Sequence, residues 1–449
     1  MAEPTVSPTS LIHPSSIPNR WIQLVAGIFA MMAIANLQYA WTVFTKPIQA
    51  HMHATLVSVQ WTITLFVALE TWLVPFEGYL VDVIGPRFML GMGALAVGLG
   101  WIGSGKAETL SGLYFWYGLA GVGAGMVYGG TIGNALKWFP DHRGLCVGFT
   151  AGAYGIGTAL TIVPISKMLK ASGYQHTFIV WGAIQGIVVL AAALFLAKPP
   201  AGWVPEGWKE KEAILKTRVR TSAIDLTPLE MLKQPSFYVV YLMMTMLAFG
   251  GIVVTVQLSP MAVSYHVDKV IVAFGMSALV LAIELDRILN GLTRPFWGWV
   301  SDHIGRENAL FFSFVLEAIA VFALLQLISR PIWFIALSGL CFFAWGNIYS
   351  LFPSITADLY GRKWATTNYG VVYTAKGLAT MFAAPGAAWL FEKTGSWTKV
   401  FWAMIICDLL AAFMALLWLK PLAKRTIEEG NRKASPVDPP APVKTRVVA

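Results

Sequence analysis

The residues with the clearest chemical meaning are two cations inside long apolar stretches, Arg294 and Lys376. Arg294 precedes Asp302 by eight residues, and Lys376 follows Lys363 by thirteen. At about 1.5 Å per helical residue, they lie roughly 12 Å and 20 Å from those polar ends, near the middle of a bilayer core about 30 Å thick. An uncompensated cation at that depth costs at least about 2.5 to 3.5 kcal/mol, so each side chain needs an acidic partner or an internal cavity.

Together, the two cations predict a site for a small anion with two negative charges. The guanidinium of Arg294 can hold a carboxylate through two hydrogen bonds, while the ammonium of Lys376 supplies a compact, mobile charge. Arg287 stands three residues after Glu284, so we expect a local ion pair between them. The alternative for Arg294 and Lys376 is a pair of intramembrane salt bridges, for which the available acids are Glu70, Glu77, Glu284, Asp286, Glu317 and Asp408.

Aromatic residues accompany the two cations at similar depth. Their OH and NH groups can donate to carboxylate oxygens, and their rings exclude water and can flank a flat anion. Aromatic residues of membrane helices also serve in packing or face lipid, so only position separates these roles. The candidates are Tyr39, Tyr128, Tyr154, Trp345, Tyr349 and Tyr373.

The composition requires a membrane for these stretches to cross. Hydrophobic residues make up 57% of the chain and charged residues only 12%, whereas about a quarter of a soluble domain is charged. Cys146, Cys341 and Cys407 lie in apolar stretches without metal or disulfide spacing, which is typical of small core residues. The net charge of +9 resides in short loops and tails, which argues against a nucleic-acid partner.

Twelve apolar segments are long enough to cross a bilayer, which takes about 20 helical residues. We therefore expect an all-α integral membrane fold with twelve transmembrane helices in two six-helix bundles. The expected spans are 21–44, 58–80, 88–105, 109–134, 145–166, 178–197, 236–262, 270–299, 308–328, 331–356, 366–391 and 400–419.

The basic residues indicate the orientation of these spans. Of the 32 Lys and Arg residues, 21 fall on the side that holds both termini and 8 on the other side. The positive-inside rule therefore predicts a multi-pass protein of the cell (inner) membrane with both termini in the cytoplasm. The expected parts are a cytoplasmic N-terminal segment 1–20, an N-terminal bundle 21–197, a cytoplasmic linker 198–235, a C-terminal bundle 236–419 and a disordered cytoplasmic tail 420–449.

A sequence repeat relates the two halves. GYLVDVIGPR from Gly78 and GWVSDHIGRE from Gly298 match at an offset of 220 residues, and a second match at an offset of 222 aligns Gly148 with Gly370. The nearly equal offsets indicate duplicated halves. Each loop acid can lie at a helix N-terminus and pair with the arginine that follows it, as a latch that forms in one state and breaks in another. The alternative is a tight, charged loop that only obeys the positive-inside rule. The expected gating pairs are Asp82 with Arg87 and Asp302 with Arg306.

These motifs carry a family resemblance. The pattern G-x-x-x-D-x-x-G in both halves, with twelve spans and a long central loop, resembles the major facilitator superfamily over nearly the whole chain. Six further stretches resemble the oxalate/formate antiporter family: NLQYAWT from Asn36, KWFPDHRGL from Lys137, GFTAGAYGIG from Gly148, NGLTRPFWGWVSD from Asn290, AWGNIYSLFPS from Ala344 and NYGVVYTAKG from Asn368.

The resemblance implies a transporter whose anion-binding residues match Arg294 in TRPFWG and Lys376 in YTAKG. Tyr373 departs from the family pattern, because the well-known members have Trp there. Glu70 departs as well, since its place usually holds an uncharged amide, and an acid near the cavity leaves room for proton coupling. The resemblance also carries over Gln38, Tyr39, Tyr128, Tyr154, Trp345 and Tyr349 as substrate-binding positions.

The sequence therefore predicts exchange of small carboxylates, oxalate for formate, by a monomeric carrier in the lipid bilayer, with no cofactor and no metal. The alternative is proton-coupled transport of a monocarboxylate such as lactate or pyruvate, which Glu70 and Tyr373 motivate. An ATP-driven pump is disfavoured, because GWIGSGKA from Gly100 lacks the Ser/Thr of a phosphate-binding loop. An integral-membrane enzyme is disfavoured too, because no nucleophile with a neighbouring base is evident.

Overall fold

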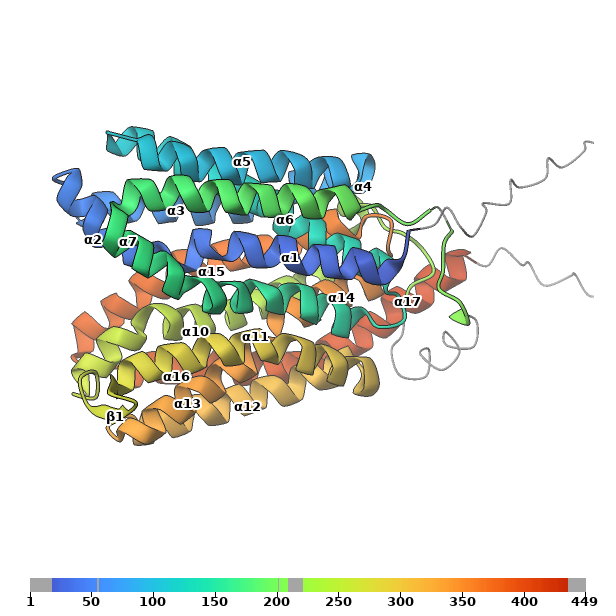
Figure 1. The fold of residues 1–449 in the computed structure, drawn as a ribbon. Helices are drawn as coiled ribbons and strands as arrows, with labels where there is room; N and C mark the ends of the chain where they lie inside the picture. The colour runs from blue at the N-terminus through green and yellow to red at the C-terminus, as the bar shows by residue number, and fades with distance from the viewer. Residues whose placement is uncertain (1–17, 55, 201, 209–220, 435–449) are drawn as a thin grey trace, which may run out of the picture.

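The computed structural model describes residues 18–54, 56–200, 202–208 and 221–434, and it is almost entirely helical. Its N-terminal bundle consists of α1 (Arg20–Tyr39), α2 (Trp41–His51), α3 (Leu56–Trp72), α4 (Val74–Ile84), α5 (Pro86–Lys106), α6 (Leu110–Trp138) and α7 (Arg143–Phe195). Its C-terminal bundle consists of α10 (Pro235–Ser264), α11 (Ala278–Ile304), α12 (Arg306–Leu327), α13 (Pro331–Trp345), α14 (Ile348–Tyr360), α15 (Ala365–Thr394) and α16 (Thr398–Met414). Figure 1 shows the long helices of both bundles running side by side.

Smaller elements connect or extend the bundles. The short helix α9 (Pro228–Met231) precedes α10, and the strands β1 (Ile271–Ala273) and β2 (Met276–Ser277) form an antiparallel hairpin before α11. The π-helical turn η2 (Ala415–Leu419) leads from α16 into α17 (Lys420–Ala434).

The helices account for the twelve expected spans. Among the described residues, eight helices are long and apolar enough to cross a membrane, or nine if α3 and α4, bent by 45°, form one span. α7 comprises two helices, because Gly173 interrupts it with a φ of 77°. α11 and α15 complete the set with 27 and 30 residues, and they carry the two buried cations.

The structure differs from several expected boundaries. The first span is broken after Tyr39 and continues as α2 to His51, and the fifth extends to the break at Gly173. The eighth span begins at Ala278 rather than at residue 270, because Phe274 and Gly275 have positive φ values of 53° and 70° and turn the chain into the hairpin. Residues 420–434, expected as disordered tail, form α17, which buries Ala423 and Ile427. The expectations for residues 1–17, 209–220 and 435–449 lie outside the described residues.

The start of α1, the described linker residues and α17 lie at one end of the bundles, at the right in Figure 1. We term this end the linker face. The linker is attached there to the C-terminal bundle, since the backbone N–H groups of Ser222 and Leu226 donate to the carbonyl oxygens of Asp358 and Tyr360, each at 2.8 Å.

Glycines let the two bundles approach each other backbone to backbone. Across the interface, α7 packs against α11 and α4 packs against α15. A Cβ added at Gly298 in α11 would clash with the carbonyl oxygen of Gly144 in α7. A Cβ added at Gly78 in α4 would stand 2.8 Å from the carbonyl oxygen of Thr366 in α15. The duplicated motif thus places its glycine at equivalent contacts in the two halves.

The second repeat serves the same purpose on the opposing helices. Gly148 of α7 faces the backbone of Arg294 and Pro295 in α11, and Gly370 of α15 faces the backbone of Val74 in α4. These contacts fix the depth at which α11 presents Arg294 to the other bundle.

Gly298→Ala should separate the bundles at the linker face, because neither backbone at this contact can yield unless its helix moves. Spin labels are placed at the exposed positions 88 on α5 and 312 on α12. The mean distance between the two labels, measured by double electron–electron resonance, should be longer than in the wild-type protein. Gly91→Ala is the matched control, because a Cβ there would meet no atom within 4 Å. Equal distances in the two variants would contradict the close contact.

Candidate functional site

Some of the predicted site residues lie at or next to helix interruptions. α1 ends directly after Gln38 and Tyr39, and α13 ends at Trp345, three residues before α14 begins at Ile348. α3 and α4 meet at their 45° bend. Discontinuous helices at the middle of a bundle are typical of binding sites in secondary transporters.

Arg294 is buried at the contact between α11 and α7, with 2% of its surface exposed. Its Nη1 donates to the carbonyl oxygen of Ala151, and its Nη2 donates to Asn290 Oδ1 at 3.2 Å. The guanidinium carbon lies 4.7 Å from the centroid of the Tyr349 ring, which is a favourable cation–π distance. Its Nε has no hydrogen-bond partner, so the guanidinium retains a free donor.

Lys376 approaches the same tyrosine from α15. It is buried, and its Nζ donates to the hydroxyl of Tyr373 at 2.9 Å. The Nζ also lies 5.0 Å from the centroid of the Tyr373 ring and 5.7 Å from that of the Tyr349 ring. Two cations from different helices therefore approach the single ring of Tyr349.

The six predicted aromatic residues form one connected cluster around the cations. Neighbouring ring centroids lie 5.0 to 6.3 Å apart in the pairs Tyr128–Tyr373, Tyr128–Tyr154, Tyr39–Tyr154, Trp345–Tyr349 and Tyr349–Tyr373. Tyr128 and Tyr373 are stacked with an interplanar angle of 20°, and this stack joins the N-terminal bundle to the C-terminal bundle. Such rings exclude water from the cations and leave tyrosine hydroxyls as donors.

Glu70 of α3 joins the cluster through Tyr154. The hydroxyl of Tyr154 lies 3.0 Å from Gln38 Oε1 and 3.2 Å from Glu70 Oε1. Glu70 is buried, and its other carboxylate oxygen has no hydrogen-bond partner. It is close enough to Lys376 to attract that charge, although the two side chains are not within ion-pair distance.

Neither Arg294 nor Lys376 forms an ion pair with a carboxylate of the described chain. The structure therefore disagrees with the salt-bridge alternative. The ion pair expected between Glu284 and Arg287 is not formed either. The guanidinium carbon of Arg287 lies instead 5.6 Å from the centroid of the Tyr39 ring.

Two neighbours of the site were not identified from the sequence. Asn290 binds Arg294, and the ring of Tyr369 lies 5.6 Å from that of Tyr373. Each stands four residues before a predicted site residue and therefore on the same face of its helix. That spacing was the available signal.

Asp82 binds the start of α15 in the other bundle at the linker face. Its Oδ2 accepts from the backbone N–H of Thr367 at 2.9 Å and from the Thr367 hydroxyl at 2.7 Å, and its Oδ1 pairs with Lys137. The first N–H groups of a helix lack partners within the helix, and an acid there satisfies them. The expected pair of Asp82 with Arg87 is not formed, because Arg87 donates to the carbonyl oxygen of Leu196 at 3.1 Å.

Asp302 makes the equivalent contact at the start of α7. Its carboxylate accepts from the backbone N–H groups of Gly144 at 3.1 Å and Leu145 at 3.0 Å. It also pairs with Arg306 at 2.6 Å, as the sequence repeat predicts.

Asp358, which the sequence did not single out, connects arginines of both bundles. It pairs with Arg143 of α7 and, at 2.7 Å, with Arg306 of α12, and all three side chains are buried. Because Arg306 also binds Asp302, a continuous network of charged groups holds the bundles together at the linker face.

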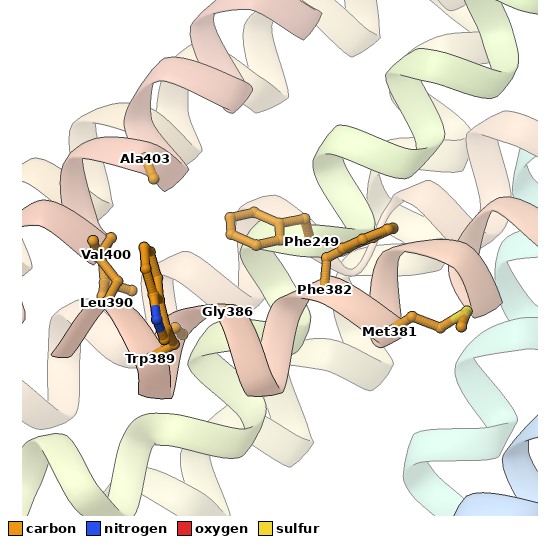
Figure 2. Close-up of a pocket in the computed structure, with 9 residues that line it drawn as sticks. Phe249, Met381, Phe382, Gly386, Trp389, Leu390, Val400 and Ala403 are labelled. Atoms are coloured by element: carbon orange, nitrogen blue, oxygen red, sulfur yellow. The ribbon is translucent and has the colours of Figure 1, made fainter. Parts of the chain in front are cut away.

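A separate, open groove of about 330 Å³ lies on the outer surface of the C-terminal bundle, between α10, α15 and α16. Figure 2 shows its lining, which is apolar and aromatic and includes Phe249, Phe382 and Trp389. A lining without charged groups gives an anion nothing to bind, so this groove is not the site described above.

Comparison with known proteins is consistent with this geometry. The family model of the Major Facilitator Superfamily matches residues 24–285 and 287–448. An oxalate:formate antiporter from Oxalobacter formigenes is 33% identical over 399 residues, covering 88% of this chain and 91% of the relative. Human monocarboxylate transporter 14 is 21% identical over 484 residues, covering 92% of each.

Solved structures agree on the fold. A proton:xylose symporter of the major facilitator superfamily superposes with a TM-score of 0.68 at 15% identity, covering 89% of this chain and 96% of its own. The human organic anion transporter MFSD10 superposes with a TM-score of 0.65 at 15% identity, covering 89% of this chain and all of its own.

The fold and these matches define a multi-pass membrane transporter rather than an enzyme. The chain belongs to the major facilitator superfamily and, within it, to the oxalate/formate antiporter family.

Asp358→Asn should weaken closure at the linker face, because it leaves Arg143 buried without a carboxylate partner. Removing one partner of a buried pair costs about 3–5 kcal/mol. A cysteine introduced at buried Ser354 of α14, in a background without native cysteines, should then be alkylated faster from the linker side. Glu428→Gln, which removes one partner of an exposed surface pair, is the control and should leave the alkylation rate unchanged. The same rate in both variants would contradict a latch at Asp358.

Proposed function

We propose that this transporter exchanges small carboxylates, oxalate for formate, by alternating access. The main support is the pair of buried cations, Arg294 and Lys376, which approach the same aromatic ring. Neither cation has a carboxylate partner in the described chain. A buried charge without a partner is strongly unfavourable, so the site is complete only with a bound anion. The activity in the name of the Oxalobacter relative supports this choice of substrates.

In this proposal the two cations have different roles. Arg294 uses its planar guanidinium, already oriented by Ala151 and Asn290, to hold one carboxylate of the substrate. Lys376 binds the other carboxylate after giving up its hydrogen bond with the Tyr373 hydroxyl. The tyrosine rings of both bundles exclude water from the bound anion, and Gln38, Tyr154 and Trp345 offer further polar groups at its edge.

Charge balance favours a dianion at this site. Two fixed cations are neutralised by oxalate, whereas a monocarboxylate leaves one positive charge uncompensated in a low-dielectric interior. Glu70 changes the balance if it is ionised, because its negative charge adds to that of the substrate.

We infer that the linker face lies in the cytoplasm, because most Lys and Arg residues fall on the side predicted to hold both termini. The chain then acts as a monomer in the inner membrane, surrounded by lipid. Asp82, Asp302, Arg306 and Asp358 hold the cytoplasmic side closed, and release of these contacts opens the site to the cytoplasm. Arg87 binds within its own bundle and has no such gating role.

A second candidate is proton-coupled transport of a monocarboxylate. It is favoured by the position of Glu70, which is hydrogen-bonded to Tyr154 and electrostatically coupled to Lys376. The similarity to human monocarboxylate transporter 14 gives this candidate additional support.

The exchange should respond to membrane potential, because oxalate entering against formate leaving carries one net negative charge inward. We expect an inside-positive potassium-diffusion potential to accelerate oxalate uptake into formate-loaded proteoliposomes. Glu70→Gln should retain this response. Uptake that ignores the potential, follows an imposed pH gradient and disappears in Glu70→Gln would instead favour the proton-coupled carrier.

Arg294→Lys should impair exchange although the charge is retained. Lysine has one ammonium nitrogen instead of a planar fork, so it cannot contact Asn290, the Ala151 carbonyl and a carboxylate in the same arrangement. Hydrogen bonds to charged groups contribute about 1.5–3 kcal/mol each. We expect kcat/KM for oxalate to fall at least about tenfold. Arg330→Lys, an exposed cation of the same bundle, is the matched control. Normal kcat/KM in Arg294→Lys would show that Arg294 supplies only bulk charge.

A further inference from the structure

A second group of buried charged residues lies in the C-terminal bundle and is not used by the transport site. Glu317 of α12 and Asp408 of α16 are buried, with 1% and 0% of their surfaces exposed. Both point at Gly250 of α10, where an added Cβ would stand 3.4 Å from Asp408 Oδ1 and 3.8 Å from Glu317 Oε1. Carboxylates from two helices thus converge on one point that the glycine leaves open.

These carboxylates are not satisfied by their surroundings. Glu317 Oε2 and both oxygens of Asp408 have no hydrogen-bond partner, and neither acid forms an ion pair within the described residues. The titratable groups nearest this pair are Cys341 of α13 and Cys407 of α16, and Asp286 of α11 acts on Cys341. None of them supplies a positive charge.

We propose that Glu317 and Asp408 form a proton-binding site inside the C-terminal bundle. Two adjacent carboxylates without a cation cannot both remain ionised in a low-dielectric interior, because desolvation and mutual repulsion add. One proton from solvent forms an O–H bond on one carboxyl group, and the other carboxylate accepts a hydrogen bond from it. The pair therefore titrates as a unit.

The position of α10 connects this pair to the transport site. Gly250 faces the two acids, and the next residue, Gly251, lies against the indole of Trp345. Trp345 in turn packs on Tyr349, the ring that the two cations approach. A shift of α10 that accompanies opening or closing therefore changes the space around both groups, and the protonation state of the pair biases that shift.

The test is infrared spectroscopy of the full-length protein in liposomes, titrated with pH in the absence of substrate. We expect a pH-dependent C=O band of a protonated carboxyl group in the wild-type protein. Buried acids elsewhere, such as Glu77 and Asp286, contribute to the same spectral region. The double variant Glu317→Gln with Asp408→Asn should therefore lose the component that belongs to the pair. Asp286→Asn, which removes another buried acid of the same bundle that does not face Gly250, should retain it. Because no substrate is present, the result is independent of the proposed exchange.

Gly250→Ala provides a second variant in case the double variant fails to fold. Its methyl group meets the carboxylate oxygens at ordinary contact distance, so the fold tolerates it. An apolar group there disfavours the ionised form, and the midpoint of the band should move to higher pH. An identical titration in the wild-type protein and the double variant would overturn the proposal. Displacement of the protonated-carboxyl band by Na⁺ at constant pH would overturn it in favour of a metal-cation site.

Discussion

The structure depends on one type of contact, in which a glycine and an aspartate of one bundle meet the start of a helix in the other. Gly298 lets α11 approach α7, and Asp302 accepts from the first N–H groups of α7. Gly78 and Asp82 make the same contact with α15. The first N–H groups of a helix have no acceptor within the helix. Here the aspartate of the other bundle accepts from them, and only while the two bundles are in contact. Separation transfers those N–H groups to water, so the contact is suited to a reversible gate.

This contact also positions the chemistry. The contacts at the linker face involve α11 and α15, and the same two helices carry Arg294 and Lys376 farther from that face. A helix is stiff, so its position at one end determines the position of residues along it. Gly148 lies directly against the backbone of Arg294, so even the depth of the guanidinium is set by the interface between bundles. The geometry of the proposed anion site is therefore linked to the contacts at the linker face.

Local patterns in the sequence were sufficient for much of this description. Apolar runs indicated the spans, the repeat indicated duplicated halves, and intramembrane charge indicated Arg294 and Lys376. The partners of charged groups across bundles were not predictable, because pairs such as Arg143 with Asp358 are 215 residues apart and follow no local spacing. Asp82 likewise pairs with Lys137, which is distant in the sequence, and not with nearby Arg87, so local spacing gave the wrong partner. The hairpin before α11 escaped detection because its short strands are as apolar as a helix end.

Away from the linker face, where Arg306 pairs with Asp302 and Asp358, the C-terminal bundle keeps its buried cations and its buried acids apart. Arg294 and Lys376 lie on α11 and α15 toward the N-terminal bundle, whereas Glu317 and Asp408 lie on α12 and α16, beyond the backbone of α10 at Gly250. Had these acids reached the cations, each pair would have been more stable than its separated members, because a buried ion pair offsets part of the desolvation of both charges. The site would then have been neutral and would have held no excess positive charge for a carboxylate. Anion binding at the proposed site therefore depends on the separation of acids and cations across α10. The acids are then left without a cationic partner, which is the reason for proposing that they bind a proton.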